Sequence, residues 1–385
     1  MAFILAAVLG GTGGGSAPEG TGTTSAAPPA EPAADGGAQG AEALGFPGFA
    51  TNNTTRVGGA DAPAVAAAAA LAAFPSRTAA QRPAAVALVG EEDWAGAVAA
   101  AVLMAEPVRA PLLISGRELP EVTAEALEAL APAGFEGGAQ AFRIGGVAVP
   151  DELRTAALGS RDAATEAAEI AKLRRRLAGS RPRHIVVAPA SAPELAVPAA
   201  AWAARSGDPV LFAERDDLPA ATATALRENA GVPVYVLGPA AAISGKVLAG
   251  IRKIAGTAKR VAGDDPVANA VAFARFDGGA GFGWNVNDPG HGFVLARAEA
   301  PLAAAAAAAL SGSGTWGPLL LTDSAAKLPA EVRSYFLDVK PGYTNNPTRA
   351  FYNHVWVIGD QEAIDVNQQA EVNELAELAR IGGEG

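Results

Sequence analysis

The chain of 385 residues contains no cysteine. Disulfide bonds, zinc sites built from thiolates and cysteine nucleophiles are therefore excluded. Histidine is also scarce: only His184, His291 and His354 are present, and their positions are too scattered to indicate a metal-binding triad. No G-x-S-x-G motif lies near any of them. We interpret all three as surface or strand-entry residues, because they lie at or near the beginning of expected strands.

Long apolar runs are missing at the N-terminus. Residues 2–9 are apolar but too few to cross a bilayer, which takes roughly 20 residues. Together with the small residues that follow, residues 1–9 resemble a secretory signal, although no Lys or Arg precedes them. We therefore predict export, with no membrane span in the mature chain.

The next segment, residues 10–52, is rich in Gly, Ala, Pro and Thr and has no hydrophobic periodicity. Such a composition predicts a disordered linker. Its glycine run at residues 10–15 does not meet the G-x-G-x-x-G spacing, and no helix pattern follows it. A dinucleotide site needs both features, so no cofactor is expected.

Basic charge is in short supply as well. The formal net charge is −11 and the isoelectric point is about 4.9. Proteins that bind nucleic acids usually carry a basic patch, and the one basic cluster, residues 174–176, is interpreted as a solvated helix face. We expect no nucleic-acid partner.

What the chain does contain is a pattern that occurs three times. Each copy has a proline, an apolar strand, a polar loop with one basic residue, and Leu-Pro at the start of a helix. The copies are residues 110–120, 208–219 and 317–329, and their Leu-Pro prolines are 99 and 110 residues apart. A threefold internal repeat predicts three similar structural units.

Each copy also alternates apolar strands with alanine-rich helices, and Asp61, Asp162 and Asp265 are expected to cap the first helices. Three strands are expected in each copy, with a helix after the third that opens near Pro150, Ser244 or Asp365. Continuous apolar strands separated by helices predict a parallel sheet covered on both faces. We therefore predict an α/β fold of three-layer units, with repeats at 53–158, 159–258 and 259–376 and a tail at 377–385.

Ligands of open α/β sheets bind at the carboxyl ends of the strands, so the loops after the strands hold the candidate site residues. After the second strand a cation recurs in all three repeats, as Arg117, Arg215 and Lys327. These side chains are either ordinary surface charges or ligands for a phosphate or uronate group.

After the first strand of repeat one come Glu91, Glu92, Asp93 and Trp94. The carboxylates suit an acid/base pair, a calcium site, or charges that complement a helix N-terminus. Trp94 either stacks on a sugar or fills the interface between repeats, and we favour the interface.

Three segments of repeat one carry a family resemblance. Residues 89–100 (VGEEDWAGAVAA), 110–115 (APLLIS) and 144–146 (IGG) resemble the cell-wall-binding repeat 2 family. The resemblance extends over about residues 53–375 and is strongest in repeat one. Residues 189–195 and 296–301 replace the Glu-Asp-Trp loop in the other repeats, and insertions occupy 277–291 and 340–353. These departures argue against three equal binding sites.

The resemblance implies three Rossmann-like or toprim-like units packed as a pseudo-trimer. It also implies an exported protein of a Gram-positive cell wall that binds an anionic secondary wall polymer non-covalently and is not an enzyme. Other surface proteins are further potential partners. Because the chain is acidic, binding needs a local basic pocket or divalent cations that bridge two acidic partners.

Two alternatives stay open. One is an enzyme that acts on a wall glycan or nucleotide-sugar in a strand-end cleft, although we find no catalytic pair. The other is a two-lobed soluble sugar-binding receptor, although that fold has two similar halves and this sequence has three periods.

Overall fold

The computed structural model describes residues 50–135, 138–159 and 162–381, all within one compact unit at residues 37–385. The signal-like segment, most of the predicted linker and the end of the tail lie outside the described residues. The last residues of the expected linker are described, and the Thr51 hydroxyl donates a hydrogen bond of 2.6 Å to Asn373 Oδ1. This end of the linker is therefore bound to the folded part.

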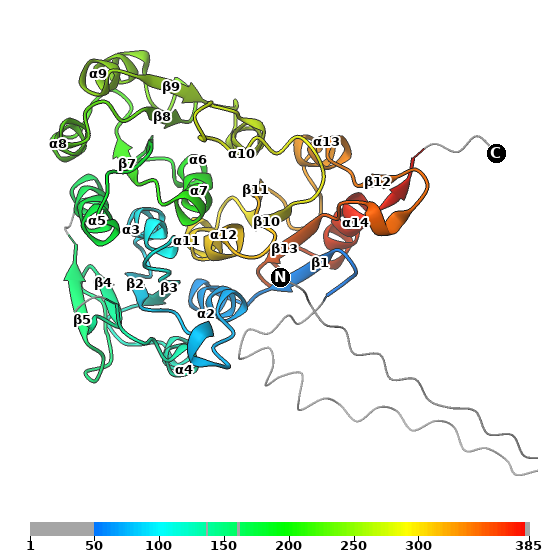
Figure 1. Ribbon diagram of the computed structural model, residues 1–385, viewed down its shortest axis with the longest axis horizontal. Coiled ribbons are helices and arrows are strands. Elements are labelled where there is room, and N and C mark those ends of the chain that lie inside the picture. The colour runs from blue at the N-terminus through cyan, green and yellow to red at the C-terminus, as the bar shows by residue number, and fades with distance from the viewer. Residues whose placement is uncertain (1–49, 136–137, 160–161, 382–385) are drawn as a thin grey trace, which may run out of the picture. The chain divides into compact units, whose positions relative to one another are not determined.

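Three parallel sheets form the framework (Figure 1). The first has the strand order β3-β2-β4-β5, the second β7-β6-β8-β9 and the third β11-β10-β13-β1. The first-sheet strands are β2 (Val86–Gly90), β3 (Leu112–Ser115), β4 (Ala141–Ile144) and β5 (Thr155–Leu158). The second-sheet strands are β6 (Ile185–Pro189), β7 (Val210–Ala213), β8 (Val234–Leu237) and β9 (Ala258–Val261). The third-sheet strands are β10 (Gly292–Arg297), β11 (Leu319–Thr322), β13 (His354–Ile358) and β1 (Thr54–Val57).

Helices cover both faces of these sheets, which confirms the predicted α/β class and the threefold recurrence. The first unit has α2 (Ala62–Ala73), α3 (Trp94–Ala100) and α4 (Glu121–Leu130). The second has α5 (Ala163–Ala178), α6 (Pro193–Ala196), α7 (Pro198–Ser206), α8 (Ala220–Glu228) and α9 (Gly245–Ala255). The third has α10 (Pro266–Arg275), α11 (Pro301–Ala306), α12 (Ala308–Gly312), α13 (Ala330–Asp338) and α14 (Val366–Ala376).

The helix starts follow the sequence signals. The carboxylates of Asp61, Asp162 and Asp265 cap α2, α5 and α10, and each accepts a hydrogen bond from a backbone N–H three residues ahead. The prolines of the three Leu-Pro pairs occupy the N-cap positions of α4, α8 and α13. The predicted capping residues and Leu-Pro helix starts are therefore confirmed.

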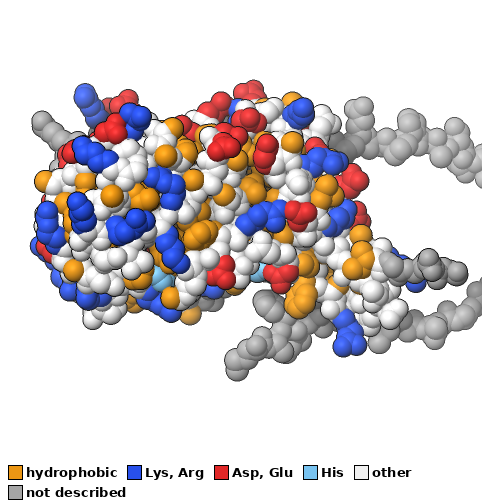
Figure 2. All heavy atoms as spheres, turned by 90° about the horizontal axis from the view of Figure 1, so that it is seen from above, with side chains coloured by type: hydrophobic (Ala, Val, Ile, Leu, Met, Phe, Trp, Pro, Cys, Tyr) orange, Lys and Arg blue, Asp and Glu red, His pale blue; other side chains and the backbone are white. Residues whose placement is uncertain are grey.

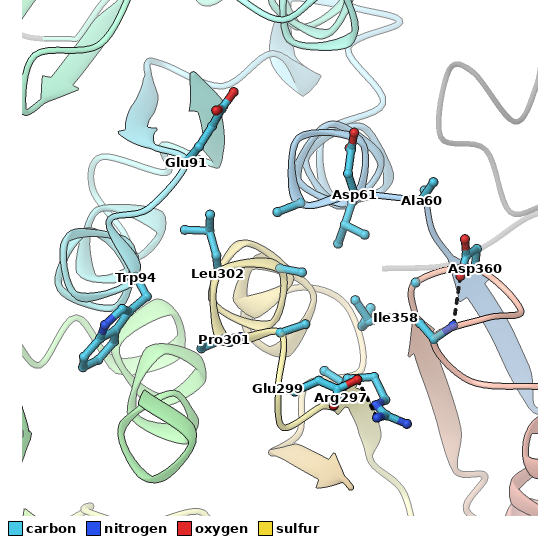
Figure 3. Close-up of a pocket in the computed structure, with 18 of the residues that line it drawn as sticks. Ala60, Asp61, Glu91, Trp94, Arg297, Glu299, Pro301, Leu302, Ile358 and Asp360 are labelled. Atoms are coloured by element: carbon cyan, nitrogen blue, oxygen red, sulfur yellow. Dashed lines mark hydrogen bonds and ion pairs between the residues drawn. The ribbon is translucent and has the colours of Figure 1, made fainter. Parts of the chain in front are cut away.

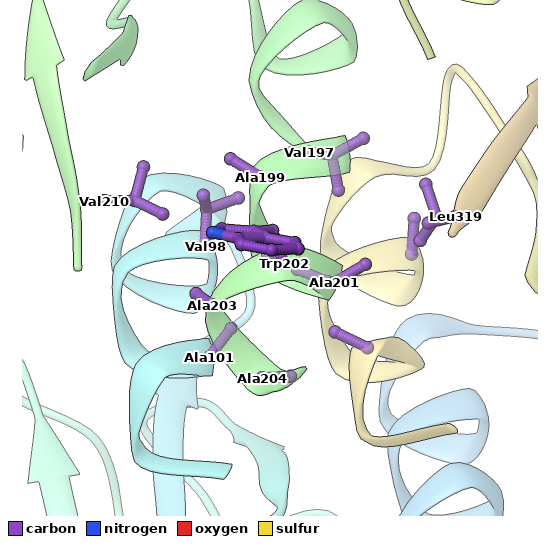
Figure 4. Close-up of a cluster of buried hydrophobic side chains, with 14 of the residues drawn as sticks. Val98, Ala101, Val197, Ala199, Ala201, Trp202, Ala203, Ala204, Val210 and Leu319 are labelled. Atoms are coloured by element: carbon purple, nitrogen blue, oxygen red, sulfur yellow. The ribbon is translucent and has the colours of Figure 1, made fainter. Parts of the chain in front are cut away.

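The middle helices of the three units pack against one another. They are α3 with the 3₁₀ turn η2 (Ala101–Met104), α6 with α7, and α11 with α12. Their alanine side chains allow close approach (Figure 4). The buried ring of Trp202 on α7 packs against Phe273, Phe282 and Trp284 of the third unit. One hydrophobic core therefore runs through all three units.

Each sheet has a fourth strand that the sequence pattern did not predict. It lies at a sheet edge and contains few large apolar residues, as in Thr54–Val57 (TTRV) and Ala258–Val261 (AKRV). It therefore lacks the continuous apolar run by which the other strands were recognised. The prediction of three strands per repeat was therefore wrong.

The fourth strand of the third sheet comes from the beginning of the folded chain. β1 pairs in parallel with β13, with Thr54 beside Val355 and Val57 beside Ile358. The next helix, α2, instead packs on β3 and α4 of the first unit. The expected boundary at residue 53 therefore does not follow sheet membership, because residues 54–57 complete the third unit.

No helix follows the third strand of the first sheet, contrary to the prediction at Pro150. Ten residues separate β4 from β5, whereas twenty separate β8 from β9 and include α9. The shorter segment makes a turn and returns directly as an edge strand. The predicted helices after Ser244 and Asp365 are present, and both residues cap them.

His184 directly precedes β6, as expected for a strand-entry residue, but it is not a surface residue. Its ring is buried, and Nδ1 lies 3.1 Å from Oδ2 of the equally buried Asp208. The first insertion covers this pair, because Phe282 stacks on Tyr235 with ring centres 3.5 Å apart and Trp284 meets Trp202 edge to face. The insertion at 277–291 therefore seals the junction of the second and third units.

The other two histidines are half-buried. His354 begins β13, and burial lowers the pKa of its imidazole. The second insertion, at 340–353, contains the short strand β12 (Gly342–Tyr343), which pairs with β14 (Ala379–Arg380) of the tail.

Candidate functional site

The carboxyl ends of the first-sheet strands open into a groove of about 860 Å³. We call it the first-sheet groove. It brings Glu91, Asp93, Trp94 and Arg117 together, four of the six residues predicted to bind ligand. It is lined by residues 90–95, 115–117 and 144–147 of the first unit and by Ala163, Glu166 and Ala190 of the second.

Asp93 has a structural role at the edge of this groove. It is the N-cap of α3, and its Oδ1 accepts a hydrogen bond of 2.8 Å from Gly96 N. Glu91 and Glu92 precede it and are exposed. Negative charge at a helix N-terminus complements the helix dipole, so the helix-start interpretation holds for Asp93.

Trp94 lies between the first and second units. Its ring meets Phe212 of β7 edge to face, with centres 5.6 Å apart and planes at 82°. The side chain is half-buried and still lines the first-sheet groove. It therefore fills the inter-unit interface, as favoured from the sequence, and leaves part of its ring available to a ligand.

The three recurring cations occupy equivalent loops after β3, β7 and β11, and all are exposed. Arg117 lines the first-sheet groove. Arg215 lies at the end of the second sheet, where its Nη1 is 2.7 Å from Asp216 Oδ2 and its Nε donates to the Ala241 carbonyl. Lys327 lies at the end of the third sheet, so the cations belong to three separate places.

Sequence reasoning missed Glu166. This buried carboxylate extends from α5 of the second unit towards the start of α3, where a Cβ on Gly96 would lie 2.5 Å from its Oε1. The equivalent position, four residues after the capping aspartate, is Val65 in α2 and Asn269 in α10. The side chain of Asn269 donates to the Leu195 carbonyl. Aligning the three caps would have identified this position.

A second cavity, of about 380 Å³, lies between the third and first units (Figure 3). Arg297 is its one basic lining residue, and its Nη2 lies 2.6 Å from Glu299 Oε1. The carboxylates that line it are Asp61, Glu91, Glu92, Glu299 and Asp360. With five carboxylates to one guanidinium, this cavity is poorly suited to an anion.

Charge is unevenly divided among the units. Residues 159–258 contain 13 Lys or Arg and nine Asp or Glu. Residues 53–158 contain seven and 12, and residues 259–376 contain eight and 13. Figure 2 shows Lys and Arg gathered towards the side where Figure 1 places the second unit. The acidic chain therefore carries one basic unit, which borders the first-sheet groove.

Among the described residues, no group of three His, Asp or Glu side chains is placed to hold a metal ion. None of the described helices is both long and apolar enough to span a membrane.

The second unit carries the family match. Residues 158–248 match the family model of cell wall binding domain 2 (CWB2). The match confirms the resemblance found in the sequence, although it falls on the second repeat and the strongest resemblance was expected in the first. CWB2 indicates binding to the cell wall and a location at the cell wall, as predicted. No curated protein matches the sequence.

Two solved structures share the fold. Cwp6 from Clostridium difficile has a TM-score of 0.66 and 18% identity, over 84% of this chain and 48% of that one. Cwp8 from Clostridium difficile has a TM-score of 0.62 and 18% identity, over 85% and 52%. This chain therefore spans about half the length of the structures it matches.

Proposed function

We propose that this protein attaches to the cell wall non-covalently by binding an anionic wall polymer in the first-sheet groove. The observation that carries the proposal is the position of the groove. It opens at the carboxyl ends of the first-sheet strands and contains Arg117, and the CWB2-matching unit with its excess of basic residues forms its other wall.

Arg117 is the one guanidinium among the described residues that line the first-sheet groove, beside the carboxylates of Glu91, Glu92, Asp93 and Glu166. Further basic charge comes from the second unit, which forms the other wall of the groove. Electrostatic attraction between exposed charges is largely screened beyond about 8 Å at physiological ionic strength. The charges near the groove therefore matter more than the net charge of −11. The cavity between the third and first units has carboxylates around a single arginine. We propose that the polymer is held mainly between the first and second units.

Binding is proposed rather than catalysis because two groups that could act as an acid or base are engaged in structure, one at the groove and one away from it. Asp93 caps α3, and the His184–Asp208 pair is buried beneath aromatic rings. Three recurring sheets also differ from the two halves of a sugar-binding receptor. The wall polymer is the proposed partner.

Changing Arg117, Arg215 and Lys327 together to Ala should release the protein from purified walls, while its melting temperature stays nearly the same. Arg117→Ala alone should account for most of the loss, because Arg117 lines the groove whereas Arg215 is already paired with Asp216. Co-sedimentation with walls measures binding. Lys253→Ala, on the exposed side of α9, is the control and should bind like the parent.

The same assay tests the polymer. Walls stripped of secondary polymers should retain little protein, and equal binding to stripped and intact walls would refute an anionic polymer as the ligand. Release by a chelator, with the triple variant still bound, would instead support bridging by divalent cations.

A further inference from the structure

One position on the third and fourth strands differs between the sheets. In the second sheet Val236 of β8 pairs with Arg260 of β9, and in the third sheet Val357 of β13 pairs with Arg56 of β1. In the first sheet the equivalent pair is Arg143 of β4 with Ala157 of β5. The arginine has therefore moved from the edge strand to its inner neighbour.

The two edge-strand arginines hold their own units together. Arg260 donates hydrogen bonds of 2.6 Å to the carbonyls of Gly238 and Ile243, between β8 and α9. Arg56 donates at 2.9 Å to the Gly359 carbonyl and at 2.6 Å to that of Ile364, between β13 and α14. Both guanidinium groups therefore donate hydrogen bonds to carbonyls of the loop that leads into the next helix.

Arg143 has no such partners. Its Nε is buried and forms no hydrogen bond with the described residues, and no helix follows β4. A buried donor without an acceptor is costly, at about 1–3 kcal/mol, and such groups usually bind a partner, water or an ion. An unused guanidinium of this kind is suited to an oxyanion.

The space around Arg143 is a cavity of about 730 Å³, which we call the edge cavity. Besides Arg143 and Ala157, it is lined by Lys172 and Arg176 from α5 of the second unit. Both are exposed and form no ion pair with the described residues. Glu169 is the single carboxylate in the lining, so cations from two units outnumber it.

The edge cavity and the first-sheet groove meet at Gly145 and Gly146, which line both. A chain that passes Arg117 in the groove can therefore continue into the edge cavity. The other two sheets have no equivalent free arginine at this register, because Arg56 and Arg260 are bound internally.

We propose that the edge cavity binds an oxyanion, a phosphate or carboxylate group carried by a polymer, through Arg143, Lys172 and Arg176. This inference rests on the proposed function only for the source of the anion, which is a wall polymer. Arg143 forms paired hydrogen bonds to the group, and Lys172 and Arg176 add charge from the second unit. The protein then has one extended site across two units rather than three equal sites.

The test moves the arginine of the first sheet from β4 to its paired position on β5. Arg143→Val with Ala157→Arg gives the first sheet the pattern of the other two, in which the edge arginine binds the loop. Binding of glycerol phosphate oligomers and of galacturonate oligomers is measured by calorimetry at low salt. The parent should bind at least one of them, and the exchange should weaken this binding about tenfold or more, the effect expected for lost charge-assisted hydrogen bonds.

A second double variant tests the edge cavity without changing any residue of the first sheet. Lys172→Ala with Arg176→Ala changes exposed residues and should also weaken binding, while Lys253→Ala should not. The oligomer whose binding is lost identifies phosphate or carboxylate as the ligand group. Folding is verified by circular dichroism and melting temperature.

Three results would overturn the inference: a parent that binds neither oligomer, a folded exchange variant that binds both as tightly as the parent, or binding that is indifferent to Lys172 and Arg176. Co-sedimentation with walls distinguishes a failure of this inference from a failure of the proposed function. If the exchange variant still binds walls like the parent, the edge cavity fails and the groove stands. If the parent binds oligomers but not walls, the proposed function fails and the anion site stands.

Discussion

Replacement of Arg56 by Ala is expected to lower the free energy of unfolding by about 3–5 kcal/mol. The side chain is 4% exposed and donates to the carbonyls of Gly359 and Ile364 and, through Nε and Nη2, to Gln369 Oε1. Burial lowers the pKa of the guanidinium, an effect that the nearby Asp360 and Asp365 partly offset. Alanine would leave these buried acceptors unpaired and loosen the strand that completes the third sheet.

Urea unfolding followed by circular dichroism measures this loss. Arg260→Ala is the matched comparison, because Arg260 has the same register in the second sheet, is more exposed and forms two hydrogen bonds instead of five. It should cost about half as much. An equal or smaller loss for Arg56→Ala would contradict the view that β1 fastens the third unit.

Replacement of Asp208 by Ala should cost about 3–5 kcal/mol as well. The carboxylate is 2% exposed and accepts hydrogen bonds from His184 N at 2.9 Å and Trp202 Nε1 at 3.0 Å, besides its contact with the His184 ring. Without it, two buried donors lose their acceptor in the centre of the aromatic cluster that joins the second and third units.

Thermal unfolding and tryptophan fluorescence test this prediction. The melting temperature should fall, and Trp202 emission should change even in the folded variant because its indole N–H loses its partner. Asp216→Ala is the control: this exposed carboxylate forms a surface ion pair with Arg215, worth at most about 1 kcal/mol. If both substitutions have the same small effect, the buried network contributes little to stability.

Much of this architecture was predictable because its signals are local. The strands at residues 112–115, 210–213 and 319–322 are continuous apolar runs, and such runs predict buried parallel strands wherever they occur. The capping aspartates and the Leu-Pro pairs mark helix starts by the chemistry of one or two residues. Three repeats of this order were enough to predict the α/β class and the family.

The candidate site was predictable only in part. Placing the site at strand carboxyl ends identified Arg117, Asp93 and Trp94, which do line one groove. It could not identify Glu166, Lys172 or Arg176, because these residues lie on α5 and reach the first unit only through the packing of the next one.

The sequence by itself therefore determined the three α/β repeats, three apolar strands in each and their helix caps, since short-range patterns specify each of these. Only the tertiary structure decided which sheet each edge strand joins, that His184 is buried, and that Arg143 faces a cavity instead of a loop. The fourth strand of each sheet is short and has few large apolar residues, so its sequence does not reveal its partner. The paired residues of β1 and β13, such as Thr54 and Val355, lie about 300 residues apart in the sequence, so no local pattern specifies this pairing.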